Sequence, residues 1–319
     1  MALPTYASPL ERVWHYTYLV ICALIFTFLI APILIVMPLS FNAEPYFTFT
    51  EKMLSFDPEG YSMRWYDTLI TFGMQTPEGE RGAAFWSDFW HNATWMHVAK
   101  NSIIIGFFST ILAASLGTIA ALGLTRPEMP YRKQIMAVLI SPMIVPIIIS
   151  ATGMFFFYSG QWVPVPSFEN GLHLEWGRLA GSYPGIILAH AALGIPFVII
   201  TVTATLFGFD QSLVRASASL GANPRTTFFK VQMPLILPGV ISGGLFAFVT
   251  SFDEVVAVLF IADHTQQTIP RQMWNGIREQ ISPAILAVAT ILVIISIALL
   301  TTVELLRRRS ERLRGMSPS

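Results

Sequence analysis

Two adjacent acids, Asp253 and Glu254, stand inside a long apolar run and are the side chains best placed to do chemistry. A charge at the centre of a bilayer costs roughly 2.5 to 3.5 kcal/mol on insertion scales, so neither acid can face lipid. A carboxylate that lines a pathway could attract a protonated amine and hold it near an aromatic ring such as Phe252. A structural carboxylate would instead accept hydrogen bonds from other helices. The residues alone leave both interpretations open.

The helix that would carry these acids has two contrasting faces, since adjacent residues point about 100° apart on a helix. Small side chains allow close helix contact in a membrane, so we expect Glu254 to pair with a neighbouring helix and Asp253 to face the pathway. Counting ~1.5 Å per residue from Leu235 puts Asp253 about 27 Å along, toward the external end. The small face holds Gly243, Ala247, Thr250, Glu254 and Ala257, and the bulkier face holds Ser242, Phe246, Val249, Asp253, Val256 and Phe260.

Composition predicts a membrane protein. Only 12% of the 319 residues are charged and 54% are hydrophobic, whereas soluble proteins average about 25% charged, which excludes a single soluble globular domain. The net charge of zero gives no basic surplus for nucleic acid. Six windows nearly free of charge are long enough to cross a bilayer, so we expect one all-α transmembrane domain over residues 1–319. The expected helices cover about 17–40, 98–124, 134–158, 183–207, 235–262 and 283–306.

Six spans place both termini on one side. The first apolar window is too long for a cleaved signal peptide and is expected to be retained. Twelve of the 19 Lys and Arg residues fall on the side of the termini, which predicts cytoplasmic termini by the positive-inside rule. The segment from about 42 to 97 is then an external loop, and its many aromatic residues predict an interfacial belt or a small packed cap.

Enzyme chemistry finds no support in the sequence. The chain has no Walker A loop, no HExxH pair and no Gly-x-Ser-x-Gly elbow, and Cys22 is the single cysteine. His190, the one histidine inside a predicted span, is expected to be a buried, hydrogen-bonded residue rather than a metal ligand. We therefore expect a non-catalytic chain that binds no cofactor or metal itself.

The segment from about 208 to 233 predicts a short helix with a glycine stop. Asp210 or Ser212 can cap its start, Ala216 lies on a small side-chain surface, and Gly221 can adopt the left-handed conformation that ends a helix. Such a helix could dock in a partner's groove, although physical reasoning alone favours an ordinary surface connector.

A resemblance favours docking. Arg215-Ala216-Ser217, three residues, Gly221, nine residues and Val231-x-Met233-Pro234 resemble the EAA loop (EAA, x3, G, x9, I-x-L-P) of permease subunits of bacterial ABC importers. In that family the loop forms the coupling helix seated in the ATP-binding subunit. Arg215 replaces the usual Glu, which reverses a charge, and Ser217 replaces Ala. The resemblance assigns coupling to the ATPase to Arg215, Ala216, Ser217, Gly221, Ala222 and Pro234.

Further motifs resemble the second permease subunit of spermidine/putrescine importers. The resemblance implies the type I ABC importer permease fold with six transmembrane helices, here with an enlarged first external loop, and a pathway role for Ser251, Phe252, Asp253 and Glu254. The motifs are Pro38-Leu39-Ser40-Phe41-Asn42, Arg64-Trp65-Tyr66, Asn101-Ser102, Ser251-Phe252-Asp253-Glu254, Ile269-Pro270-Arg271 and Ile281-Ser282-Pro283.

The resemblance also implies an assembly in the bacterial inner membrane. This chain would form half of a pathway for polyamines or a related organic cation, surrounded by membrane lipid. Its partners would be a second permease, two ATPase subunits that bind ATP and Mg, and a periplasmic or lipid-anchored solute-binding protein.

Alternative functions stay open. An opine, an amino-acid derivative or a quaternary amine would suit the same importer class, because selectivity in this family resides mainly in the binding protein. A more remote alternative is a proton-coupled secondary transporter with Asp253 or Glu254 as the proton relay. Such carriers usually show two related halves, and none is evident here.

Overall fold

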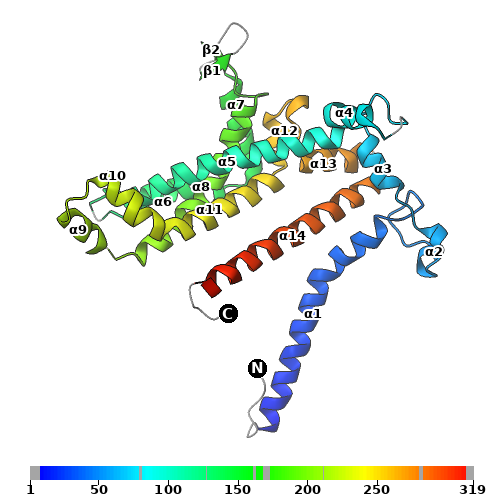
Figure 1. Cartoon of the computed structure of the whole chain (residues 1–319), viewed down its shortest axis with the longest axis horizontal. Helices are drawn as coiled ribbons and strands as arrows, with labels where there is room; N and C mark the ends of the chain where they lie inside the picture. Colours follow the sequence, from blue (N-terminus) through cyan, green and yellow to red (C-terminus); the bar gives the residue numbers. More distant parts are fainter. Residues whose placement is uncertain are drawn as a thin grey trace. The chain divides into compact units, whose positions relative to one another are not determined.

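The computed structural model describes residues 8–78, 81–126, 128–160, 163–167, 173–210, 212–279 and 283–313. Its chain divides into two compact units, residues 1–80 with 276–319 and residues 81–275. The described secondary structure is helical except for one two-stranded hairpin (Figure 1). The predicted all-α class with long apolar helices is therefore confirmed, with that hairpin as an addition.

The first unit is built on two long helices. α1 (Pro9–Leu39) begins before the predicted residue 17 because Ser8 and Glu11 form a capping box at its start. α14 (Ala284–Leu313) packs against α1 and against α3 (Arg64–Thr71). No residue in the apolar window of α1 is buried within the described chain, as expected of a helix that faces lipid or a partner.

A packed cap follows α1, and such a cap is one of the two interpretations given for the aromatic residues of segment 42–97. It contains α2 (Glu51–Leu54), the 3-10 turn η1 (Pro58–Gly60) and α3. Asn42 is fully buried and its carbonyl accepts a 2.7 Å hydrogen bond from the Trp65 indole, while the Ser40 and Tyr66 hydroxyls lie 2.8 Å apart. Two of the motifs noted in the sequence therefore meet in this cap.

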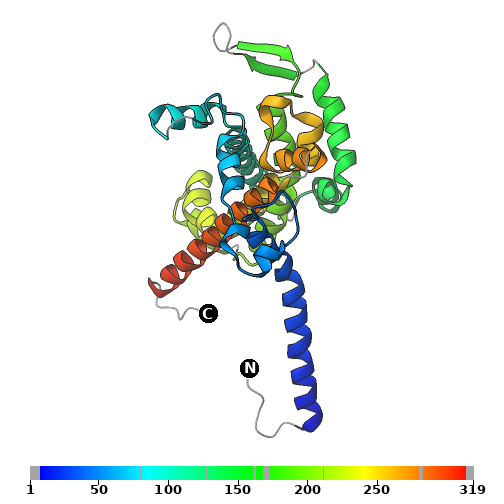
Figure 2. The same ribbon diagram turned by 90° about the vertical axis from the view of Figure 1, so that its right-hand side faces the viewer.

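Three helices form the centre of the second unit: α5 (Thr94–Leu124), α8 (Tyr183–Phe207) and α11 (Met233–Asp253), side by side in Figures 1 and 2. α4 (Ala83–Asn92) precedes α5. Glycines allow the close approach: a Cβ at Gly117 would lie 2.7 Å from Val198 Cβ, and one at Gly243 would lie 2.7 Å from Val198 Cα. The small face predicted for the acid-bearing helix is thus packed against α8.

The third predicted helix, 134–158, is not continuous. α6 (Arg132–Ile144) and α7 (Ile147–Ser159) meet at an angle of 102°. Val145 precedes Pro146 and adopts an extended conformation, because the proline ring disfavours a helical residue before it. Beyond α7, β1 (Val163–Ser167) pairs antiparallel with β2 (His173–Gly177) in the segment between the third and fourth predicted helices.

The remaining elements lie at opposite ends of this three-helix centre (Figure 1). At one end are α9 (Ser212–Ser219), α10 (Pro224–Thr227) and the π turn η2 (Phe228–Gln232). At the other end are α12 (Val256–Ile261), η3 (His264–Gln266) and α13 (Ile269–Glu279). Among the described residues four helices are long and apolar enough to cross a membrane, or five if α6 and α7 form one broken span, so the six-span topology stays a prediction.

Candidate functional site

The fifth predicted helix, 235–262, is interrupted at its acids, so the expectation of one continuous helix is wrong. α11 ends at Asp253, Glu254 is extended (φ −76°, ψ 122°), and α12 begins at Val256. Glu254 is only 8% exposed, and its Oε1 accepts a 2.9 Å hydrogen bond from the Ala257 amide. A continuous helix offers no free amide to a buried carboxylate, whereas the first turn of a new helix offers several. The break therefore provides the buried acid with a donor.

The two acids differ in their surroundings. Asp253 is exposed on the bulkier face of α11, beside the exposed Val249, and the ion pairs of the described residues do not include it. Glu254 bonds to α12, the continuation of its own chain, rather than to a neighbouring span. The C-terminal end of α11 adds the partial negative charge of its carbonyl groups. The break therefore places an exposed carboxylate, Asp253, at the C-terminal end of an apolar helix.

Buried hydroxyls tie three helices together just before the break. Ser251 of α11 is buried, and its Oγ lies 3.0 Å from the Ser109 hydroxyl of α5 and 2.8 Å from His190 Nδ1 of α8. His190 is thus a buried, hydrogen-bonded residue as expected, although its Nε2 has no partner among the described residues. Ser251 fixes the position of α11 next to the acids.

The aromatic residues near the break stack on one another. Phe252 lies against Phe248, with ring centroids 5.7 Å apart and an interplanar angle of 26°. Phe246 stacks on Phe197 with centroids 6.1 Å apart, and it is exposed on the same face of α11 as Asp253. Phe252 is therefore a packing residue, whereas Phe246 is an exposed aromatic residue two turns before Asp253 on the same face.

Charged side chains cap α12 at both of its ends. Glu254 caps its start, and Arg271 Nη1 donates to the carbonyls of Val258 (2.6 Å) and Ala262 (3.2 Å) at its end. An acid at the N-terminus and a cation at the C-terminus both complement the helix dipole. Burial lowers the pKa of Arg271, but a guanidinium stays protonated at neutral pH. These caps stabilise a helix of only six residues.

Asn101 and Ser102 anchor the segment that follows α12. Asn101 Nδ2 donates to the carbonyls of Thr265 and Gln267, both at 2.9 Å, and Ser102 Oγ accepts from the Ile269 amide at 2.9 Å. Two further sequence motifs are thereby brought together. Ile281 and Ser282, from the last motif, lie outside the described residues.

The predicted helix with a glycine stop is present as α9. Asp210 Oδ1 accepts the Ser212 amide at 2.8 Å, and the hydrogen bonds from Ser212 lower the pKa of Asp210. Gly221 adopts the left-handed conformation (φ +82°) that ends the helix. The Ser217 hydroxyl lies 2.9 Å from Thr227 Oγ1, so the serine at this position joins α9 to α10.

Most of the predicted coupling residues lie on the surface. Leu220 is 88% exposed, and Arg215 is absent from the ion pairs of the described residues. The exposed side of α9 and of the turn after it is therefore not covered by other described parts of the chain. Arg215, Ala216, Gly221 and Pro234 are exposed, and Ser217 and Ala222 are half-buried.

Pro234 is the second residue of α11 and follows the π turn η2. A proline lacks an amide donor and clashes with the carbonyl four residues earlier in an α-helix. In the π turn the Met233 amide reaches back to the Phe228 carbonyl, which changes the local pitch next to the proline. The helix therefore continues through the end of the motif.

Residues 113–314 match the profile of the family described as "Binding-protein-dependent transport system inner membrane component". The chain belongs to this family. The matched range includes α8, α9, α11 and the acidic break, so both candidate regions lie within the stretch that matches the family profile. The members of this family are inner membrane components of transport systems.

Relatives of this permease carry polyamine names. It is 26% identical over 286 residues to the spermidine/putrescine transport system permease protein PotC of Haemophilus influenzae, over 90% of this chain and 94% of that protein. It is 28% identical over 291 residues to the putrescine transport system permease protein PotI of Escherichia coli strain K12, over 91% of this chain and 88% of that protein.

Solved structures share the fold of the permease. A chain of a bacterial ABC transporter that imports the acidic polysaccharide alginate matches with a TM-score of 0.61 at 15% identity, over 94% of this chain and 98% of that one. A chain of a bacterial alginate ABC transporter in complex with an alginate pentasaccharide-bound periplasmic protein also matches. Its TM-score is 0.61 at 14% identity, over 97% of this chain and 98% of that one. These matches confirm the ABC importer permease fold.

Several residues of the site were not predicted from the permease sequence. Ser109 and Arg271 hold α11 and α12 in place, and their roles depend on contacts with distant parts of the chain. Polar residues in or next to apolar helices are the available signal, since a buried polar group must find a partner. That signal identifies such residues without identifying their partners.

Proposed function

We propose that this permease is one of two membrane subunits of an ATP-driven, binding-protein-dependent importer for polyamines such as putrescine and spermidine. The observation that carries the proposal is the interrupted fifth helix, where the exposed Asp253 and the buried Glu254 stand at the negative end of α11. An ammonium group is the chemistry that such a point attracts. The names of the relatives PotC and PotI support the same substrate class.

Asp253 is the proposed contact for the passing cation. Its carboxylate lies on the exposed face of α11, two turns after the aromatic ring of Phe246. One ammonium of a polyamine can bind the carboxylate while another part of the same molecule lies against the ring. Glu254 contributes charge from behind while it caps α12. Selectivity among polyamines then depends on the binding protein as well as on this acid.

α9 is the proposed docking element for an ATPase subunit. Its exposed surface includes Arg215 and Leu220, and Arg215 in place of the usual acid favours an ATPase surface with an acidic residue opposite. ATP and Mg would bind to the two ATPase subunits. A second permease would supply the other half of the pathway, and a periplasmic or lipid-anchored binding protein would deliver the solute.

The proposal includes an orientation. The excess of Lys and Arg on the side of the termini favours cytoplasmic termini. α9 would then face the cytoplasm and the acidic break would lie toward the external side, in agreement with their positions at opposite ends of the second unit (Figure 1).

The test is uptake of labelled putrescine and spermidine into vesicles that contain the whole complex, its binding protein and enclosed ATP. Two unit charges 4 Å apart interact by about 4 kcal/mol at an effective dielectric constant of 20, so Asp253→Asn should lower uptake at least about tenfold. Glu78→Gln removes an exposed external acid far along the chain and should leave uptake unchanged.

Three results would contradict the proposal. Equal loss in the Glu78 variant would indicate a general charge effect. ATP turnover by the wild type without movement of either polyamine would exclude these substrates while retaining the importer. Uptake that persists without the ATPase subunits would favour a secondary transporter.

A further inference from the structure

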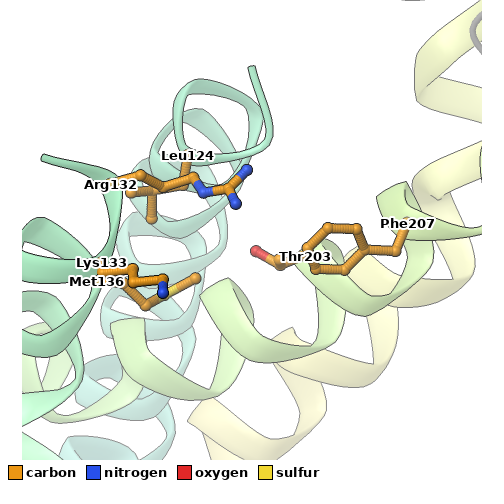
Figure 3. Close-up of a pocket in the computed structure, with 6 residues that line it drawn as sticks. All are labelled: Leu124, Arg132, Lys133, Met136, Thr203 and Phe207. Carbon is orange, nitrogen blue, oxygen red and sulfur yellow. The ribbon is translucent and has the colours of Figure 1, made fainter. Parts of the chain in front are cut away.

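The second unit contains a pocket with two cations that the proposed transport mechanism does not use (Figure 3). Its volume is about 230 Å³, several times the ~30 Å³ that one water molecule takes in the liquid. Leu124 comes from the end of α5 and Phe207 from the end of α8, while the first turns of α6 supply the cations. The lining residues are Leu124, Arg132, Lys133, Met136, Thr203 and Phe207.

A buried hydroxyl without a partner lines this pocket. Thr203 is only 6% exposed, and its Oγ1 has no hydrogen-bond partner among the described residues. Thr201 and Thr205 on the same helix donate to carbonyls of the preceding turn, as helical threonines commonly do. Figure 3 shows the Thr203 hydroxyl and the Arg132 guanidinium facing the same space. A donor that is left free in this way requires an acceptor from outside the chain.

Three further features favour an anion as that acceptor. The ion pairs of the described residues include neither Arg132 nor Lys133. Both residues lie in the first turn of α6, a helix of 13 residues whose start receives no side-chain cap, so the positive end of its dipole is uncompensated. Two cations, a helix N-terminus and a free hydroxyl together match the several oxygens of a phosphate group.

We propose that this pocket binds the phosphate headgroup of an anionic phospholipid. Leu124 and Phe207 are the last residues of two helices that are long and apolar enough to cross a membrane, so the pocket stands where a bilayer's headgroups begin. Phe207 is exposed beside the cations and gives an acyl chain an apolar surface. A basic pocket between transmembrane helices is a setting that suits anionic headgroups.

The test uses the complete transporter in detergent and measures its thermal stability during titration with phosphatidylglycerol or phosphatidylcholine. Native mass spectrometry counts the lipids that stay bound. Wild type should bind phosphatidylglycerol preferentially. Each basic residue near a membrane surface contributes about fivefold, so the Arg132→Gln/Lys133→Gln variant should bind phosphatidylglycerol about 25-fold more weakly. Thr203→Val, which keeps the shape of the side chain, should weaken it several-fold.

Arg126→Gln is the matched control, because Arg126 is an exposed cation in the same connection but outside the pocket. An equal loss of phosphatidylglycerol binding in this variant, or equal binding of both lipids by wild type, would overturn the proposal. The wild-type comparison does not depend on the folding of any variant. Stabilisation by inorganic phosphate alone to the same extent would replace the lipid with a soluble phosphate. Loss of the ATPase subunits from the double variant, with phosphatidylglycerol binding intact, would instead assign the pocket to a partner's carboxylates.

Discussion

Replacing Gly221 tests whether coupling depends on the backbone conformation that ends α9. Gly221 has φ +82°, and a Cβ added there would meet no heavy atom within 4 Å. The cost of a substitution is therefore conformational rather than steric. An ordinary L residue in the left-handed region costs about 1 to 2 kcal/mol, whereas asparagine tolerates it better and a β-branched residue tolerates it worse. We expect function to fall in the order Gly, Asn, Ala, Val.

The magnitude follows from this conformational cost. A change of 1 to 2 kcal/mol lowers the ratio of correctly ended to frayed α9 by about 5- to 30-fold. If the ATPase recognises α9 only in its formed state, its apparent affinity for the permease falls with the formed fraction, and so by at most the same factor. Gly221→Ala should lie within this range and Gly221→Asn should lie closer to wild type.

The assay is solute-stimulated ATP hydrolysis by the assembled complex, together with amide hydrogen exchange across α9. Basal hydrolysis and the yield of the complex show that each variant is assembled. Alanine performing as well as glycine would refute the conformational argument. Asparagine performing worse than alanine would show that side-chain size matters, and hence that the partner contacts Gly221 directly.

Three other substitutions test the packing and the caps. Gly243→Ala brings a Cβ to 2.4 Å from a threonine hydroxyl of α8 and should lower the melting temperature. Gly153→Ala, whose Cβ would meet no heavy atom within 4 Å, should keep or raise the melting temperature. Equal effects of the two variants would contradict the close approach of α8 and α11. Ser251→Ala leaves a buried imidazole nitrogen unpaired and should lower the free energy of unfolding by about 1 to 3 kcal/mol in denaturant unfolding. Ser115→Ala, which removes an exposed hydroxyl, should have little effect. Similar losses of unfolding free energy in both variants would exclude the buried network as the cause. The lowered pKa of Asp210 means that its cap is formed above the ordinary carboxyl value of 3.8 and is lost as the pH falls below it. The protection of the α9 amides, taken relative to their intrinsic exchange rate at each pH, should therefore fall in acid for wild type but not for Asp210→Asn. Protection that is independent of pH in wild type would refute the cap.

Local features of the fold could be predicted from the sequence. Gly221 and Asp210 act through residues close to them in the chain, so their spacing predicted both ends of α9. The 102° bend before α7 also has a local signal, because Pro146 restricts the residue that precedes it. The proline gives the position of a break but not its angle. The long apolar run around it favoured a single continuous helix.

The break at Glu254 has no comparable local signal. No proline or glycine stands between residues 245 and 262, and the helix ends because a buried carboxylate takes an amide from the next turn. Burial is a property of the packed chain. Likewise, Asn101 bonds to carbonyls 164 and 166 residues away, a pairing that sequence spacing does not reveal.

The helical run that leads to this break has a mechanical consequence. Helix continues without interruption from Pro224, which follows the turn that contains Gly221 after α9, to Asp253, through the π turn and Pro234. Thirty residues at about 1.5 Å each make a connecting rod roughly 45 Å long. A displacement of the Pro224 end would thus be carried to Asp253 by continuous helix. The chain becomes extended only after Asp253, so the end of the rod that carries the proposed cation contact is joined to α12 by a short non-helical link, while α12 has caps of its own.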